Sequence, residues 1–329
     1  MYEDFKEELT SKEERLKNKI QKEIAYCYNC QPYDCGEPVW IYGDRTDIQY
    51  LFYRLNIDEE YWNKILDHLF CPCGNETLTL SCDVGVRTKY EKDLENFVNN
   101  SNKAFVKKIE NFTKLLENTP FLGYGDSFGK KLYKELKGGQ FPVTAINPNE
   151  SYFRARKVNN HDILESNKML NAPQGKPTEG RFNHSGQSYL YLAENKETAI
   201  KEVAQNDKNF LVWLQEFKFK RKVDKILDLT FDITNISLGE NPLLVALSLT
   251  NSLKKHKNNL DYWRPDYFIT RYIMDCAKEF GYNGIKYNST KSTHDFNIVL
   301  FYSQEQEILN IGEPIIEISR DKKKEVFDL

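Results

Sequence analysis

The sequence has 329 residues, of which 40% are hydrophobic and 29% are charged, and its formal net charge is −3. This length exceeds the commonest size of a single domain, so we expect two domains. The 20 tyrosines, 20 phenylalanines and 4 tryptophans supply large rings for a core, which indicates a globular protein. The near balance of charge disfavours a protein held mainly by nucleic-acid phosphates.

The sequence shows no sign of membrane association. No run approaches the roughly 20 apolar residues of a transmembrane helix, and the charged N-terminus lacks the apolar core of a signal peptide. We therefore expect a cytoplasmic protein with no membrane partner.

Six of the seven cysteines lie before residue 83, at Cys27, Cys30, Cys35, Cys71, Cys73 and Cys82. In a reducing compartment this clustering indicates a metal before it indicates disulfides. Cys27 and Cys30 together with Cys71 and Cys73 would supply four thiolates for a structural zinc ion. The second pair is one residue shorter than in a zinc ribbon, so free, partly buried thiols are the alternative. A catalytic cysteine is disfavoured, because His68 is the only histidine near either pair.

The N-terminal part of the chain has helical periodicity. The spacing of apolar residues predicts helices at 3–26, 44–69 (two short ones), 91–118 and 129–137. The sequence from Gly138 to Pro142 then breaks the pattern. We therefore predict a mainly helical domain over residues 1–140, with the cysteine cluster, and a second domain over residues 150–329.

The second domain contains predicted strands together with a few predicted helices, which indicates an α+β fold. Aromatic and β-branched runs predict strands at 152–158, 188–193, 210–219, 225–229, 284–287 and 298–302, with 315–318 as an edge. Helices are predicted at 196–205, 242–255 and 265–280, the last with Pro265 at its first position.

Two arginines are candidates for anion binding. Arg154 lies within a half-apolar strand, where an unpaired guanidinium is costly to bury, so it needs either an anionic ligand or a structural ion pair. Arg181 follows Gly180 in a loop, and a glycine lets the backbone and the guanidinium approach a phosphate together.

Three further side chains stand at the ends of predicted elements. Alternation places Tyr189 and Tyr191 on one face of their strand, where packing is the simpler role. Glu202 lies beside the apolar face of its helix and needs either a partner such as an arginine or a catalytic task. Ser289 follows a strand without a Gly-x-Ser-x-Gly elbow, which disfavours a serine hydrolase.

Several short motifs in order, between Tyr152 and Tyr302, carry a family resemblance. They are Tyr-Phe-Arg-Ala-Arg at 152–156, Gly-Arg-Phe-Asn at 180–183, Tyr-Leu-Tyr-Leu-Ala at 189–193, Glu-Thr-Ala-Ile-Lys-Glu at 197–202, Gly-Ile-Lys-Tyr-Asn-Ser at 284–289 and Asn-Ile-Val-Leu-Phe at 297–301. In these motifs the chain resembles the RES domain family over slightly under half of its length.

This resemblance implies a fold like that of ADP-ribosyltransferases and an enzyme that breaks the nicotinamide–ribose bond of NAD. The cleavage would be phosphorolysis or hydrolysis, often as the toxin of a toxin–antitoxin pair. The implied partners are NAD, inorganic phosphate and an antitoxin or regulatory protein, and a homo-oligomer stays open. An ADP-ribosyltransferase acting on a protein or nucleic acid, and a non-catalytic nucleotide-sensing module, are the alternatives.

The family's functional positions fall on Arg154, Arg181, Tyr191, Glu202 and Ser289, the first three of which would contact NAD. Phe182 stands where many members have tryptophan. An insertion at 157–179 leaves open whether Arg154 or Arg156 is the first functional arginine.

The N-terminal region looks like the cysteine-containing, HEPN-related helical domain that precedes some RES domains. HEPN ribonucleases use an arginine followed by a histidine four to six residues further on. None of the histidines (His68, His161, His184, His256 and His294) follows an arginine in this way within a helix of the region, so ribonuclease activity is not expected.

Overall fold

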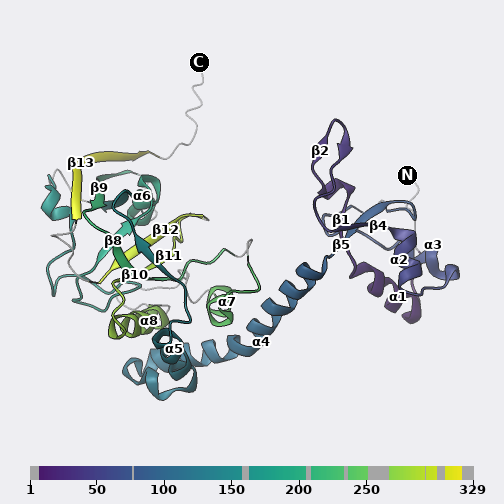
Figure 1. Cartoon of the computed structure of the whole chain (residues 1–329), viewed down its shortest axis with the longest axis horizontal. Helices are drawn as coiled ribbons and strands as arrows, with labels where there is room; N and C mark the ends of the chain where they lie inside the picture. Colours follow the sequence, from purple (N-terminus) through teal and green to yellow (C-terminus); the bar gives the residue numbers. More distant parts are fainter. Residues whose placement is uncertain are drawn as a thin grey trace. The chain divides into compact units, whose positions relative to one another are not determined.

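The structure is a computed structural model that describes residues 7–75, 78–157, 163–204, 209–232, 236–250, 267–292, 294–301 and 308–320. Contacts divide the chain into an N-terminal unit, Met1–Asn96, and a C-terminal unit, Phe97–Leu329 (Figure 1). Helices and strands occur in both units, which confirms the α+β class. Across the part of the chain that the structure describes, no helix combines the length and hydrophobicity needed to span a bilayer.

The first helix of the N-terminal unit is shorter than the periodicity predicted. Helix α1 spans Ser11–Gln21 and begins with a capping box formed by Thr10 and Glu13. The chain then forms strand β1, Ile24–Cys27, which pairs with β5, Asp83–Val86. Cross-strand pairing and burial outweigh helical spacing after Gln21, while residues 3–6 of the predicted helix lie outside the described residues.

The rest of this unit surrounds a three-stranded sheet with the order β1-β5-β4. The remaining elements are η1 Tyr28–Cys30, β2 Tyr33–Asp34, β3 Glu37–Pro38, β4 Asp44–Asp47, α2 Ile48–Arg54, η2 Glu59–Tyr61 and α3 Trp62–Leu66. Helix α2 is capped by Asp47, whose side chain accepts a hydrogen bond from the Tyr50 amide. Residues 44–47, at the start of the segment predicted as helical, instead form β4, which pairs with β5.

Helix α4, Lys89–Asn118, is the long amphipathic helix expected at 91–118. Its buried residues Ile109, Phe112 and Leu116 recur at helical spacing and join the core of the C-terminal unit. Helix α5, Ser127–Lys137, is capped by Asp126 and contributes to the same core. The contact division therefore lies N-terminal to the boundary predicted between the two domains, because α4 and α5 pack against elements of the C-terminal unit.

The C-terminal unit is built on an eight-stranded sheet with the order β13-β9-β7-β8-β12-β11-β10-β6. Strands β10 and β11 are parallel, and the other neighbours are antiparallel. Its elements are η3 Pro120–Gly125, β6 Val143–Ile146, β7 Tyr152–Lys157, η4 Ser166–Met169, β8 Leu190–Ala193, α6 Lys196–Ala204, β9 Asn209–Phe219, β10 Val223–Asp228, α7 Pro242–Leu249, α8 Phe268–Glu279, β11 Gly284–Asn288, β12 Phe296–Leu300 and β13 Ile308–Arg320. The expected edge segment 315–318 belongs to β13, whereas Pro265 lies outside the described residues.

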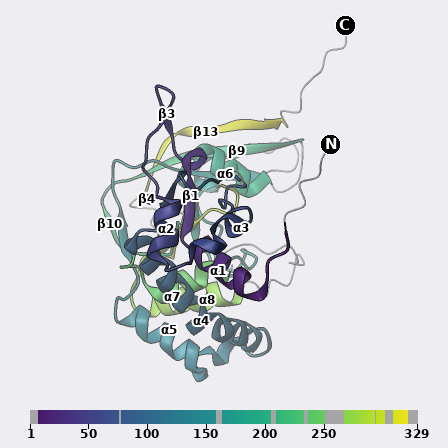
Figure 2. The same cartoon turned by 90° about the vertical axis from the view of Figure 1, so that its right-hand side faces the viewer.

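The two faces of this sheet carry different clusters. Tyr189 and Tyr191 share the face that packs with α5, α7 and α8, whereas Leu190 and Leu192 belong to the cluster on the other face. Figures 1 and 2 show these three helices together on one side of the sheet. Helix α6 packs separately on β7, β8 and β9, with Ala199 in a small cluster of alanine, valine and leucine side chains.

Candidate functional site

Glu202 lies near the end of α6, where the apolar neighbours of its helix turn pack on the sheet. Its Oε1 accepts a hydrogen bond from Ser289 Oγ at 2.8 Å and another from Asn297 Nδ2 at 2.8 Å. Ser289 follows β11, Asn297 lies in β12, and both side chains are buried. Two strands that neighbour each other in the sheet thus hold one carboxylate oxygen from a helix that precedes both in the sequence.

Tyr191 supports the turn that carries Arg181. The Tyr191 hydroxyl donates to Asn183 Oδ1 at 2.9 Å and accepts from the Phe182 amide at 3.2 Å. The Gly180 amide donates to the Asn183 carbonyl, which closes the turn. A Cβ atom at Gly180 would clash with Asn183 Oδ1 and lie 3.3 Å from the Tyr191 hydroxyl, so the turn requires glycine there.

The guanidinium of Arg181 lies over two tyrosine rings. Its Cζ is 5.3 Å from the ring centroid of Tyr287 and 5.8 Å from that of Tyr267, distances typical of cation–π contacts. Burial raises the pKa of Tyr287 well above its ordinary value, while Arg181 lowers this pKa and Tyr191 and Glu202 raise it. Tyr287 is therefore within electrostatic range of three of the predicted site residues.

Arg154 is partly separated from this group. In the described part of the chain no hydrogen bond joins it to the other predicted site residues, and its buried Nη1 has no partner. Burial and, to a smaller extent, the nearby Arg156 lower the pKa of Arg154 to about 10, while Tyr191 opposes this shift. Arg154 and Tyr191 are therefore close enough to interact electrostatically.

Arg154 and Arg156 differ in how their side chains are used. The pairing of β7 with β9 is continuous from Tyr152 to Lys157, so the two arginines, which are two residues apart, share one face. Arg156 Nη1 donates to the Lys168 carbonyl of η4, which gives it a structural partner. By contrast, Arg154 Nη1 is buried and has no hydrogen-bond partner among the described residues.

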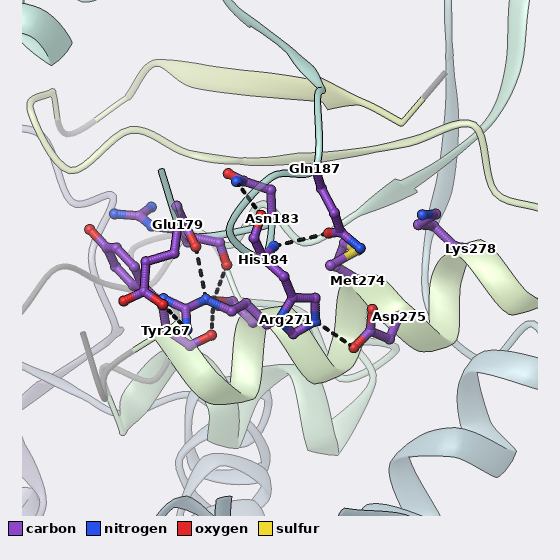
Figure 3. Close-up of polar contacts among 12 residues, drawn as sticks. Glu179, Asn183, His184, Gln187, Tyr267, Arg271, Met274, Asp275 and Lys278 are labelled. Atoms are coloured by element: carbon purple, nitrogen blue, oxygen red, sulfur yellow. Dashed lines mark hydrogen bonds and ion pairs between the residues drawn. The ribbon is translucent and has the colours of Figure 1, made fainter. Parts of the chain in front are cut away.

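Helix α8 holds the loop before β8 along one of its faces (Figure 3). Arg271 Nε donates to the Gly180 carbonyl at 3.0 Å, and its Nη1 lies 2.9 Å from Glu179 Oε2. Thr270 Oγ1 donates to the Arg181 carbonyl at 2.5 Å. One turn further along, His184 Nε2 lies 2.8 Å from Asp275 Oδ2. The backbone on both sides of the Arg181 side chain is thus anchored to a buried helix.

Four residues of this arrangement were not singled out from the sequence. Asn183, Tyr287 and Asn297 lie within the motifs quoted above. Their position as polar side chains among apolar motif residues was the signal that could have identified them as site residues. Arg271 lies within an amphipathic helix, and no local pattern distinguishes it from a surface arginine, although its side chain is only 3% exposed.

The four cysteines proposed as metal ligands converge in the N-terminal unit. The sulfur atoms of Cys27, Cys30, Cys71 and Cys73 all lie within 4.8 Å of one another. Cys35 is exposed, and Cys276 is buried in α8 of the other unit. A single four-sulfur group is therefore formed by the residues that the spacing selected.

Comparison with known proteins found similarity to a protein family and to solved structures. The family model described as RES domain matches residues 152–321. No curated protein matched the chain. Among solved structures, the chain is similar to one from the M. tuberculosis MbcT–MbcA toxin–antitoxin complex, with 13% sequence identity and a TM-score of 0.34 over 56% of this chain and 91% of that one.

Proposed function

The chain belongs to the RES domain family, and we propose on this basis that it is an enzyme that cleaves the nicotinamide–ribose bond of NAD. Inorganic phosphate or water would be the acceptor. The observation that carries the proposal is the carboxylate of Glu202, which Ser289 and Asn297 hold by the same oxygen near Tyr287 and Arg181.

Glu202 would stabilise the transition state. When the bond between the ribose C1 and the nicotinamide nitrogen breaks, its electron pair goes to the ring nitrogen and positive charge develops on the ribose. A carboxylate fixed beside the ribose favours this charge electrostatically. Since Ser289 and Asn297 both donate their hydrogen bonds to Oε1, we propose that Oε2 faces the ribose. The nicotinamide leaves as a neutral molecule, so no general acid is needed.

The arginines would bind the anionic parts of the reactants. Arg154 has a buried Nη1 without a partner, and Arg181 is held at a turn whose backbone is anchored on both sides. A guanidinium binds phosphate oxygens with two parallel hydrogen bonds, which fix geometry as well as charge. We assign the NAD pyrophosphate or an incoming inorganic phosphate to these two residues.

Tyr191 would act by positioning. Its hydroxyl is engaged by Asn183 and the Phe182 amide, so it maintains the turn before Arg181. This supports a positioning role in place of the direct contact with NAD that the resemblance implied.

A product analysis tests the proposal directly. Purified protein is incubated with NAD, with and without inorganic phosphate, and the products are identified by mass spectrometry. Phosphorolysis gives nicotinamide and phosphorylated ADP-ribose, whereas hydrolysis gives nicotinamide and ADP-ribose. Label transferred to a macromolecule would indicate an ADP-ribosyltransferase, and unchanged NAD despite binding would indicate a sensing module; either result would overturn the proposal.

The matched variants lie on one helix. Glu202→Gln keeps the size of the side chain but removes its charge, and we expect a loss of NAD cleavage of about a hundredfold or more. Glu197→Gln removes an exposed carboxylate from the first turn of α6 and is expected to leave activity unchanged. Full activity of Glu202→Gln in a folded protein would exclude the assigned role.

An NAD-degrading activity would be harmful to the cell that makes it. We therefore propose that the protein acts as a toxin restrained by an antitoxin or other regulatory protein, and that its fold is of the ADP-ribosyltransferase type. Expression of the wild type and of Glu202→Gln tests the toxin role, because only the wild type should deplete cellular NAD and arrest growth.

A further inference from the structure

The N-terminal unit contains a four-cysteine group that the NAD chemistry does not use. Cys27 ends β1 and Cys30 ends η1, so the first pair belongs to one continuous strand-to-turn segment. Cys71 and Cys73 lie in the turn that follows α3, where the Cys71 amide donates to the Asn75 carbonyl and the Gly74 amide donates to the Cys71 carbonyl. Each pair is therefore presented by a hydrogen-bonded turn.

The distances between the sulfur atoms distinguish a metal site from disulfides. Cys27 Sγ is 3.6 Å from Cys73 Sγ and 4.0 Å from Cys30 Sγ, and Cys30 Sγ is 3.5 Å from Cys71 Sγ. A disulfide needs a separation of about 2.0 Å. Four sulfurs at about 2.3 Å from a tetrahedral zinc ion lie about 3.8 Å apart, which matches the observed spacing.

We propose that these four cysteines bind one zinc ion as thiolates and that the ion is structural. Soft thiolate ligands in a tetrahedral set select zinc or iron over hard cations. Four protein ligands complete the tetrahedron and leave no open position for a substrate or a reactive water.

The surroundings of the sulfurs support this assignment. Asn75 Nδ2 donates to Cys27 Sγ at 3.4 Å, the kind of outer contact that orients a metal-bound thiolate. Cys27 and Cys71 are also fully buried members of the hydrophobic core of the N-terminal unit, next to Ile24 and Leu69. Zinc would therefore join two segments more than 40 residues apart in the sequence at the edge of that core, where Cys30 is half-buried and Cys73 is exposed.

The experiment measures metal in the full-length protein. Protein purified without added metal or chelator is analysed by inductively coupled plasma mass spectrometry, and one zinc per chain is expected. Cys27→Ser and Cys73→Ser should each lose most of the zinc. Cys35→Ser, which alters an exposed cysteine of the same unit, should retain it.

A second measurement covers variants that fail to fold. In the wild type, a mercurial reagent should release one zinc per chain to a chromogenic indicator, and replacement by cobalt should give the absorption bands of a tetrahedral tetrathiolate. Stoichiometric iron, wild-type protein without zinc even after reconstitution, or zinc lost from Cys35→Ser but kept by Cys27→Ser would each overturn the proposal. None of these outcomes depends on whether NAD is cleaved.

Discussion

Ser289 Oγ lies 2.8 Å from Glu202 Oε1, although the two residues are 87 positions apart in the sequence. Asn297 donates to the same oxygen, so the carboxylate is fixed by two donors that lie outside its own helix. An electrostatic role in catalysis requires such fixation. A mobile carboxylate would have to become ordered in the transition state, and the entropic cost of this ordering would reduce the stabilisation that it provides.

Removing either donor should weaken catalysis without abolishing it. A hydrogen bond to a charged group contributes about 1.5–3 kcal/mol, so Ser289→Ala and Asn297→Ala should each lower kcat by about tenfold to a hundredfold. The double variant should lose less than the product of the two single effects, because both donors orient one carboxylate. Steady-state nicotinamide release measures these values. Single variants with unchanged kcat would show that the carboxylate does not need this support.

The two arginines of β7 should respond differently to replacement by lysine. Arg154→Lys keeps a positive charge but loses the planar pair of donors, so KM for NAD or phosphate should rise by about tenfold or more. Arg156→Lys removes the hydrogen bond to the Lys168 carbonyl and should mainly lower the unfolding temperature. Kinetics and thermal unfolding of both variants provide the comparison. The reverse pattern would assign the functional arginine to position 156.

A single methyl group at position 180 should disturb the site. Gly180→Ala places a Cβ against Asn183 Oδ1 and beside the Tyr191 hydroxyl, so the turn that carries Arg181 must shift. We expect a loss of NAD cleavage of about tenfold to a hundredfold, since small displacements of binding groups are costly. Gly125→Ala, where nothing lies within 4 Å of the added atom, is the matched control. Equal activity of both variants would argue against a rigid turn.

Arg271 should act as a positioning residue for Arg181. Replacement by methionine removes its hydrogen bond to the Gly180 carbonyl and its ion pair with Glu179. KM should then rise more than kcat falls, because the reacting carboxylate is untouched. Arg271→Lys, which retains the charge beside Glu179, should restore part of the loss. A merely structural role would instead lower stability in both variants and leave KM of the folded fraction unchanged.

Buried tyrosines should set the alkaline limit of stability. Burial raises the pKa of Tyr191 and Tyr287 above the ordinary value of about 10, so in the folded protein they keep protons that the unfolded chain releases. The stability that these two tyrosines contribute is therefore fully present below pH 10 and is lost as the pH rises above it. Tyr287→Phe should flatten this decline in unfolding temperature. A decline that stays equally steep would point to other groups.

The parts of the structure that depend on local sequence were predictable. Helix α4 has apolar residues at helical spacing along one face, and the β8–α6 segment alternates and then changes to helical spacing, so both could be predicted from periodicity. The predicted C-terminal end of the first helix was wrong, because the residues after Gln21 form β1, and β1 pairs with β5, which lies far along the chain.

The site itself was only partly predictable for the same reason. Motifs indicated Glu202 and Ser289 separately. No sequence pattern predicts that Asn297 donates a hydrogen bond to the same oxygen of Glu202, or that Arg271 donates one to the Gly180 carbonyl. The choice between Arg154 and Arg156 also needed the structure, since alternation treats them alike and only their partners differ.

The packing of α4 and α5 has a practical consequence for dissecting the chain. Both helices precede the segment that matches the RES family, yet Ile109, Phe112, Leu132 and Leu136 complete the core around α8. A fragment that starts at residue 150 would present this apolar face of α8 to water and would tend to aggregate. The smallest soluble catalytic fragment should therefore start near Phe97, well upstream of the family match.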